Sequence, residues 1–201
     1  GRINDLVRTA SFTIDLALQL DRVPTPKFIV LTSDGGSAPG EVSLEIEADG
    51  QGAARARFWS VNNAGTAIVW NTGPGTIPIA RAFKLSFRRD GDTGNIDLSI
   101  DGIALAKTLE QGSAPTSWSP VPARTWYIGE WPGAASAAYE GLMAELVVWT
   151  RAVAAAELQT LARAQNAIWL ADFDAGEIAA ADSMLIDLTP HAHPAIGFTP
   201  K

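Results

Sequence analysis

Residues 83–102 read FKLSFRRDGDTGNIDLSIDG, and this stretch decides the fold class. Apolar side chains alternate with polar ones on both sides of a glycine-containing turn, which is typical of two half-buried strands. Placing Phe87 opposite Leu98 gathers the apolar side chains on one face, and the same register sets Arg88 opposite Asp97 on the other. Because the apolar and the charged pairings select one register, the stretch predicts a β-hairpin.

The same argument predicts a second hairpin within residues 41–60. If Glu47 lies opposite Arg55 and Glu45 opposite Arg57, the apolar residues of both strands share the other face. Further strands are predicted at Ser11–Leu20, Lys27–Ser33, Thr66–Asn71, Trp126–Trp131 and Leu142–Thr150, and one helix at Ala154–Ala164. Many strands with one late helix predict an all-β fold: a two-sheet antiparallel β-sandwich with one short helix toward the C-terminus.

Composition narrows the possible partners. A chain of 201 residues suits one sandwich domain, and the absence of cysteine excludes disulfides and thiolate metal sites. The formal net charge of −7 argues against nucleic acid, which is bound by clustered Lys and Arg. No apolar run is long enough to span a bilayer, so no membrane insertion is expected.

Outward from the hairpins, the chain resembles a known family. Residues 126–133 (WYIGEWPG), 139–149 (YEGLMAELVVW) and 150–153 (TRAV), followed by Glu157-Leu158, are similar to the closing portion of laminin G-like, concanavalin A-like jelly-roll domains. The hairpin 83–102 resembles the central hairpin of that family, and the likeness covers about residues 10–165. It implies a jelly roll, a fold that carries lectins, adhesion modules and glycosidases alike.

The end of the chain departs from the family pattern. Family members usually begin with a Phe-Asp strand and an Asp-Leu-Ser-like segment, whereas here Phe173-Asp174 and Asp187-Leu188-Thr189 come last. We therefore expect a laminin G-like domain at residues 1–165 and a C-terminal segment at 166–201. This segment either supplies strands that complete the sandwich or begins a following repeat.

Three tryptophans are candidate ligand-binding residues. Aromatic rings stack on the apolar faces of sugars, while nearby polar groups bind the hydroxyls. Trp131 and Trp118 lie in loop-like, proline-containing stretches and are expected to be exposed, whereas Trp59 shares a polar strand face with arginines. We expect the two loop tryptophans to be the main contacts. The alternative for each of the three is an ordinary structural role.

Two groups of acidic residues suggest other chemistry. Glu45, Glu47 and Asp49 alternate along one strand, as the carboxylates of jelly-roll glycosidases do, although pairing with arginines is the plainer interpretation. Asp90, Asp92 and Asn95 offer oxygen ligands in one turn and are a candidate calcium site. The alternative is that they only stabilise the turn, since Asp and Asn side chains bond the nearby backbone.

Three functions remain open from the sequence. The leading hypothesis is a non-catalytic recognition module for carbohydrate or a cell-surface partner. It would belong to a bacterial extracellular protein or a phage-like fibre or spike, at the cell surface or on a virion. The alternatives are a glycoside hydrolase or lyase that uses Glu45 and Glu47, and a structural spacer or oligomerisation domain.

Overall fold

The structure is a computed structural model of the chain, and it describes residues 10–33, 38–120, 126–129, 137–158, 169–172 and 177–179. One sheet consists of β2 (Lys27–Thr32), β3 (Val42–Ala48), β4 (Ala54–Val61), β5 (Ala67–Thr72), β9 (Lys107–Gln111) and β10 (Tyr127–Ile128). The other consists of β1 (Phe12–Leu20), β6 (Phe83–Arg89), β7 (Ile96–Ile100), β8 (Ile103–Ala104), β11 (Gly141–Trp149), β12 (Trp169–Asp172) and β13 (Glu177–Ala179). One short helix, α2 (Ala155–Leu158), follows β11.

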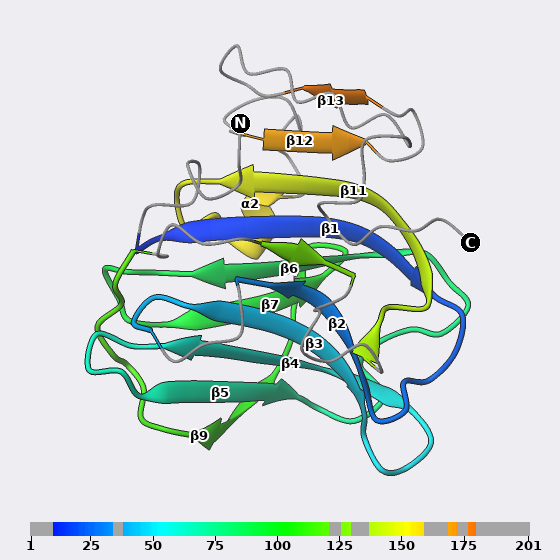
Figure 1. Ribbon diagram of the computed structural model, residues 1–201, viewed down its shortest axis with the longest axis horizontal. Helices are drawn as coiled ribbons and strands as arrows, with labels where there is room; N and C mark the ends of the chain where they lie inside the picture. The colour runs from blue at the N-terminus through cyan, green and yellow to red at the C-terminus, as the bar shows by residue number, and fades with distance from the viewer. Residues whose placement is uncertain are drawn as a thin grey trace.

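The two antiparallel sheets form the layers of a jelly-roll sandwich (Figure 1). The six-stranded sheet has the order β10–β2–β3–β4–β5–β9, and the seven-stranded sheet has the order β13–β12–β11–β1–β6–β7–β8. Between them lies one apolar core, to which both sheets contribute alternate residues of their strands. The predicted all-β sandwich with one short late helix is therefore confirmed. In the part of the chain that the structure describes, no helix is long and apolar enough to cross a membrane.

Both hairpin registers are as predicted. In the first, β3 pairs with β4, and Glu45 lies opposite Arg57. In the second, β6 pairs with β7, and Phe87 lies opposite Leu98 while Arg88 lies opposite Asp97. The alternation of the strands thus fixes which side chains face the core and which face outward.

Three of the described strands, β8, β9 and β13, were not predicted, and all three are at sheet edges. β8 and β9 have mostly exposed side chains, so they carry no apolar alternation that would identify them. At the opposite edge of the seven-stranded sheet, β12 pairs with β11 and β13 pairs with β12 (Figure 1). In the C-terminal segment we expect strands around 169–174, where β12 lies, and around 186–188, which lie outside the described residues. The division at residue 165, and the choice between completion of the sandwich and a following repeat, stays a prediction.

One end of the sandwich is held by a buried cation that the sequence analysis did not single out. Arg89 continues the inward alternation of Leu85 and Phe87, and its side chain is 0% exposed. Its N–H groups donate to the carbonyl oxygens of Ala10, Gly40 and Ser119 and to the hydroxyl of Ser60. Burial lowers the pKa of Arg89 to about 9, so it keeps its proton at neutral pH. The guanidinium ties together segments that lead into β1 and β3 and the segment that follows β9.

Candidate functional site

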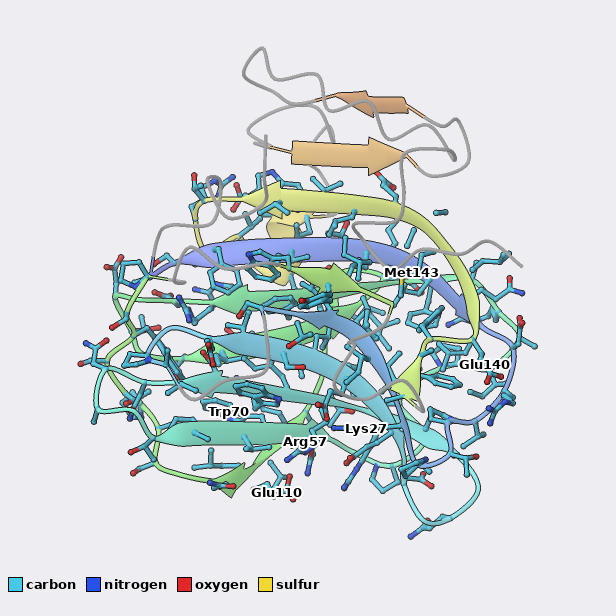
Figure 2. All side chains as sticks on the ribbon, in the orientation of Figure 1. Lys27, Arg57, Trp70, Glu110, Glu140 and Met143 are labelled. Carbon is cyan, nitrogen blue, oxygen red and sulfur yellow. The ribbon has the colours of Figure 1, made fainter. Side chains whose placement is uncertain are left out.

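A continuous row of charged and amide side chains crosses the outer face of the six-stranded sheet. The core side of this sheet carries apolar residues such as Leu44 and Phe58, so the residues between them point outward. The row runs from β2 through β3, β4 and β5 to the edge strand β9, and its members are Lys27, Glu45, Arg57, Asn71 and Glu110. Figure 2 shows the labelled Lys27, Arg57 and Glu110 close together in front of these strands.

Hydrogen bonds connect all members of the row. Lys27 Nζ donates to Glu45 Oε1 at 2.8 Å, and Arg57 Nη1 donates to Glu45 Oε2 at 3.0 Å. At the β9 end, Arg57 Nε and Asn71 Nδ2 both donate to Glu110 Oε2, at 3.3 and 2.9 Å. The row therefore alternates in charge, and two donors converge on one oxygen of Glu110.

Burial changes along the row. The side chain of Glu45 is only 4% exposed, whereas that of Glu110 is 48% exposed. The hydrogen bond from Asn71 is the largest cause of the lowered pKa of Glu110. Burial opposes it with a smaller effect, and Arg57 lowers the pKa further. Burial lowers the pKa of Arg57, but Glu45 and Glu110 outweigh it and raise the pKa above its usual value. Arg57 and Glu110 are therefore both charged at neutral pH. The row is most open to solvent at Glu110 and is partly open at Lys27, whose side chain is 34% exposed.

Trp59 stands beside this row. It is two residues from Arg57 on the same face of β4, about 7 Å along the strand. Its neighbours in register, Ser43 and Val69, are small or apolar and are buried, while Trp59 itself is half-buried. A partly exposed indole ring thus lies next to hydrogen-bonding groups, which is the combination that sugar binding requires.

Asn71 contributes a buried acceptor to the same place. The residue is 6% exposed and lies opposite Arg57 in register. Its Nδ2 donates to Glu110, whereas its Oδ1 has no hydrogen-bond partner among the described residues. A buried oxygen without a donor is costly, and this oxygen is out of contact with solvent.

The three alternating carboxylates of β3 are all engaged. Glu45 is bonded as above, and Glu47 Oε1 accepts from Arg55 at 2.7 Å, as the predicted ladder requires. Asp49 closes the turn that follows β3: its carboxylate accepts from the backbone N–H groups of Gln51, Ala53 and Gly75. The bond from Gln51 is the largest cause that lowers the pKa of Asp49. The outer-face carboxylates thus form charge pairs, and Asp49 stabilises turns.

The expectation that Trp118 is exposed is wrong. The residue is 5% exposed and belongs to the core. Its ring centroid lies 6.1 Å from that of Trp70, and the guanidinium of Arg89 lies 5.6 Å from it. The proline-containing loop places this indole at the closed end of the sandwich, where it has almost no surface to offer a sugar. Trp131 lies outside the described residues, and its role stays a prediction.

The predicted calcium ligands meet in one turn, where Asp90 acts as the turn-forming residue. Its Oδ1 accepts from the backbone N–H groups of Asp92 and Thr93, and its Oδ2 is paired with Arg88. Asp92 and Asn95 are exposed. In the described part of the chain, no three His, Cys, Asp or Glu side chains are grouped to hold a metal ion. One of the predicted ligands is thus already occupied by a guanidinium.

Three members of the row were missed by the sequence analysis: Lys27, Asn71 and Glu110. Lys27 and Asn71 lie on strands next to the predicted Glu45–Arg57 pair, and Glu110 lies one strand further, so the row as a whole is found only when the strand order is known. Lys27 could have been predicted as a partner of Glu45, because it begins a predicted strand that can pair with Glu41–Ala48. Glu110 could not be placed from the sequence, because no strand was predicted around it.

Comparison with known proteins agrees with this architecture. Residues 2–159 match the profile of the concanavalin A-like lectin/glucanases superfamily. The chain belongs to this superfamily. A comparison with curated proteins finds no match.

Several solved structures share the fold. A candidate carbohydrate-binding protein from Bacteroides ovatus is 17% identical with a TM-score of 0.62, over 86% of this chain and 49% of that one. The CBM40 of a Ruminococcus gnavus sialidase, solved with α2,3-sialyllactose bound, is 13% identical with a TM-score of 0.56, over 76% and 82% of the two chains. The NanB sialidase of Streptococcus pneumoniae is 16% identical with a TM-score of 0.59, over 79% of this chain and 25% of that one. This chain thus spans about half the length of the Bacteroides ovatus protein.

Proposed function

We propose that this chain is a non-catalytic carbohydrate-recognition module, and that it binds glycans on the outer face of the six-stranded sheet around Trp59. The observation that carries the proposal is the half-buried indole of Trp59 beside the row of hydrogen-bonding side chains. A sugar ring on the indole would place its hydroxyls within reach of Arg57, Asn71 and Glu110. Membership of the lectin/glucanases superfamily supports the same class of ligand.

The pairing of the carboxylates favours recognition over hydrolysis. A glycosidase needs one carboxyl that carries a proton and a second that is free to attack or to activate water. Both oxygens of Glu45 instead accept from cations, and Glu47 is paired with Arg55. Binding at this face therefore does not expose a free catalytic pair.

We further propose that the module works as part of a larger bacterial protein outside the cell or of a phage-like fibre or spike. Support comes from the Bacteroides ovatus protein and the NanB sialidase, in which the matching region is about half and a quarter of the chain. Such a module would bring a surface or an attached domain to its glycan.

The test is a glycan array followed by titration of the best ligand against Trp59→Ala and Trp59→Phe. Loss of the indole should weaken binding about tenfold or more, while phenylalanine should retain part of the stacking. Assay of reducing-sugar release over the same glycans should show no turnover. Binding that is unchanged in Trp59→Ala would remove this face as the site and would favour the loop that contains Trp131. Release that disappears in Glu45→Gln would establish the hydrolase instead.

A further inference from the structure

We infer that Glu110 occupies the anion-binding position of the outer-face site, so that the module selects neutral glycans and rejects acidic ones. This inference rests on the proposed function of the same surface, but it concerns which sugars are admitted. It assigns to one residue of the edge strand β9 the role of a specificity determinant.

The geometry at Glu110 is that of an occupied anion site. Arg57 Nε at 3.3 Å and Asn71 Nδ2 at 2.9 Å point at one carboxylate oxygen, Oε2. Converging charged and amide donors are the usual means by which proteins bind a ligand carboxylate. Here the carboxylate comes from the protein itself.

The charges of the surrounding face are balanced. Lys27 is paired with Glu45, Arg55 with Glu47, and Arg57 with both Glu45 and Glu110. These three cations and three carboxylates sum to zero, on a chain whose formal net charge is −7. A uronic or sialic acid that entered the site would have to approach Glu110 against like charge, and no cation of this row would gain a partner that it lacks.

Neutral sugars meet a different surface. Their hydroxyls can donate to the carboxylate of Glu110, whose side chain is about half exposed. A carboxylate group has no proton to give to this acceptor at neutral pH, whereas the hydroxymethyl group in its place on a neutral sugar has one. The donors that a carboxylate group would need are therefore engaged, while the exposed carboxylate of Glu110 can accept from a hydroxyl.

Glu110 is placed so that its removal should expose the anion site without unfolding the protein. Its side chain is about half exposed and it lies on an edge strand that pairs on one side, with β5. Exposed ion pairs contribute little to stability. Substitution with alanine frees Arg57 Nε and Asn71 Nδ2 and leaves the row with one excess positive charge.

The experiment compares wild type, Glu110→Ala and Glu110→Gln. Each is titrated with methyl glucoside and with methyl glucuronide, which differ in one carboxylate, while NMR follows the Arg57 Nε–H and the Asn71 side-chain amide. The control is Glu140→Gln, which removes a charge from the exposed Arg22–Glu140 pair (2.6 Å), well apart from Glu110 in Figure 2.

We expect wild type and Glu140→Gln to prefer the neutral sugar. Glu110→Ala should shift the ratio of affinities toward the glucuronide about tenfold or more, and Glu110→Gln should shift it less because the amide still fills the position. A wild type that binds the glucuronide as tightly as the glucoside would overturn the inference, and so would a Glu110→Ala variant with an unchanged ratio.

The two proposals fail in different ways. If wild type binds no sugar but Glu110→Ala binds the glucuronide at Arg57 and Asn71, the inference about Glu110 holds and the proposed function is wrong. If wild type binds glycans at this face but Glu110→Ala gains nothing for acidic ones, the proposed function holds and the inference is wrong.

Discussion

The buried cation Arg89 and the outer-face row are two ways of placing charge in one β-sandwich. Arg89 donates to the backbone carbonyl oxygens of three separate segments, and none of its surface reaches solvent. The row alternates cations with carboxylates and grades from the buried Glu45 to the half-exposed Glu110. The first arrangement allows no exchange of partners and therefore stabilises the fold. The second can exchange partners at its open end, which is what a binding surface needs.

Of the substitutions that compare the two regions, the largest loss of stability is expected at Arg89. Arg89→Met keeps most of the volume but leaves several buried carbonyl oxygens without donors, so the free energy of unfolding should fall by about 3–5 kcal/mol. Urea denaturation measures it. Arg22→Met, which removes an exposed arginine from its pair with Glu140, should change the free energy of unfolding far less than Arg89→Met does. Equal losses in the two variants would refute the structural role of Arg89.

A smaller effect is expected at Glu45, whose side chain is only 4% exposed. Glu45→Gln replaces a carboxylate that accepts from two cations, and the free energy of unfolding should fall by about 1.5–3 kcal/mol. Glu47→Gln, with one arginine partner and more solvent, is the matched variant and should cost less than about 1 kcal/mol. If Glu47→Gln cost as much as Glu45→Gln, the gradient of burial along the row would have no energetic consequence.

The smallest effect is expected at the open end. Since Asn71 and Arg57 lower the pKa of Glu110 below its usual value near 4.5, the folded state holds this carboxylate in its charged form more strongly than the unfolded state. The stabilisation is complete above the unfolded pKa and is lost as the pH falls through the folded pKa. Glu110→Gln should therefore make stability slightly less dependent on pH below about 4.5, as measured by thermal unfolding across that range. An identical pH profile in wild type and variant would contradict the assignment.

The sequence predicts the hairpins better than the site, for a physical reason. Register within a hairpin depends on residues that are close in the chain, and the Glu45–Arg57 pair follows from alternation alone. Glu110 joins Arg57 across an intervening strand, so its role depends on sheet order. The inward position of Arg89 could have been predicted from the sequence, because it follows Leu85 and Phe87 in the same alternation.

Trp118 shows the limit of reading exposure from local composition. Its serine- and proline-rich surroundings are typical of a surface loop, yet the loop passes over the end of the sandwich beside Arg89. The large ring fills that end and packs on Trp70. Trp59, by contrast, lies in a regular strand, and its alternation with Phe58 correctly predicts an outward position.

The most direct test of the account follows the indole N–H resonances of the tryptophans while a glycan selected by array is added. We expect the Trp59 resonance to shift with saturation, together with the side-chain amide of Asn71, while the resonances of the buried Trp70, Trp118, Trp126 and Trp149 stay unchanged. These four serve as controls within the same molecule. Saturable shifts of Trp131 with no movement of Trp59 would place the site on the loop and contradict the account.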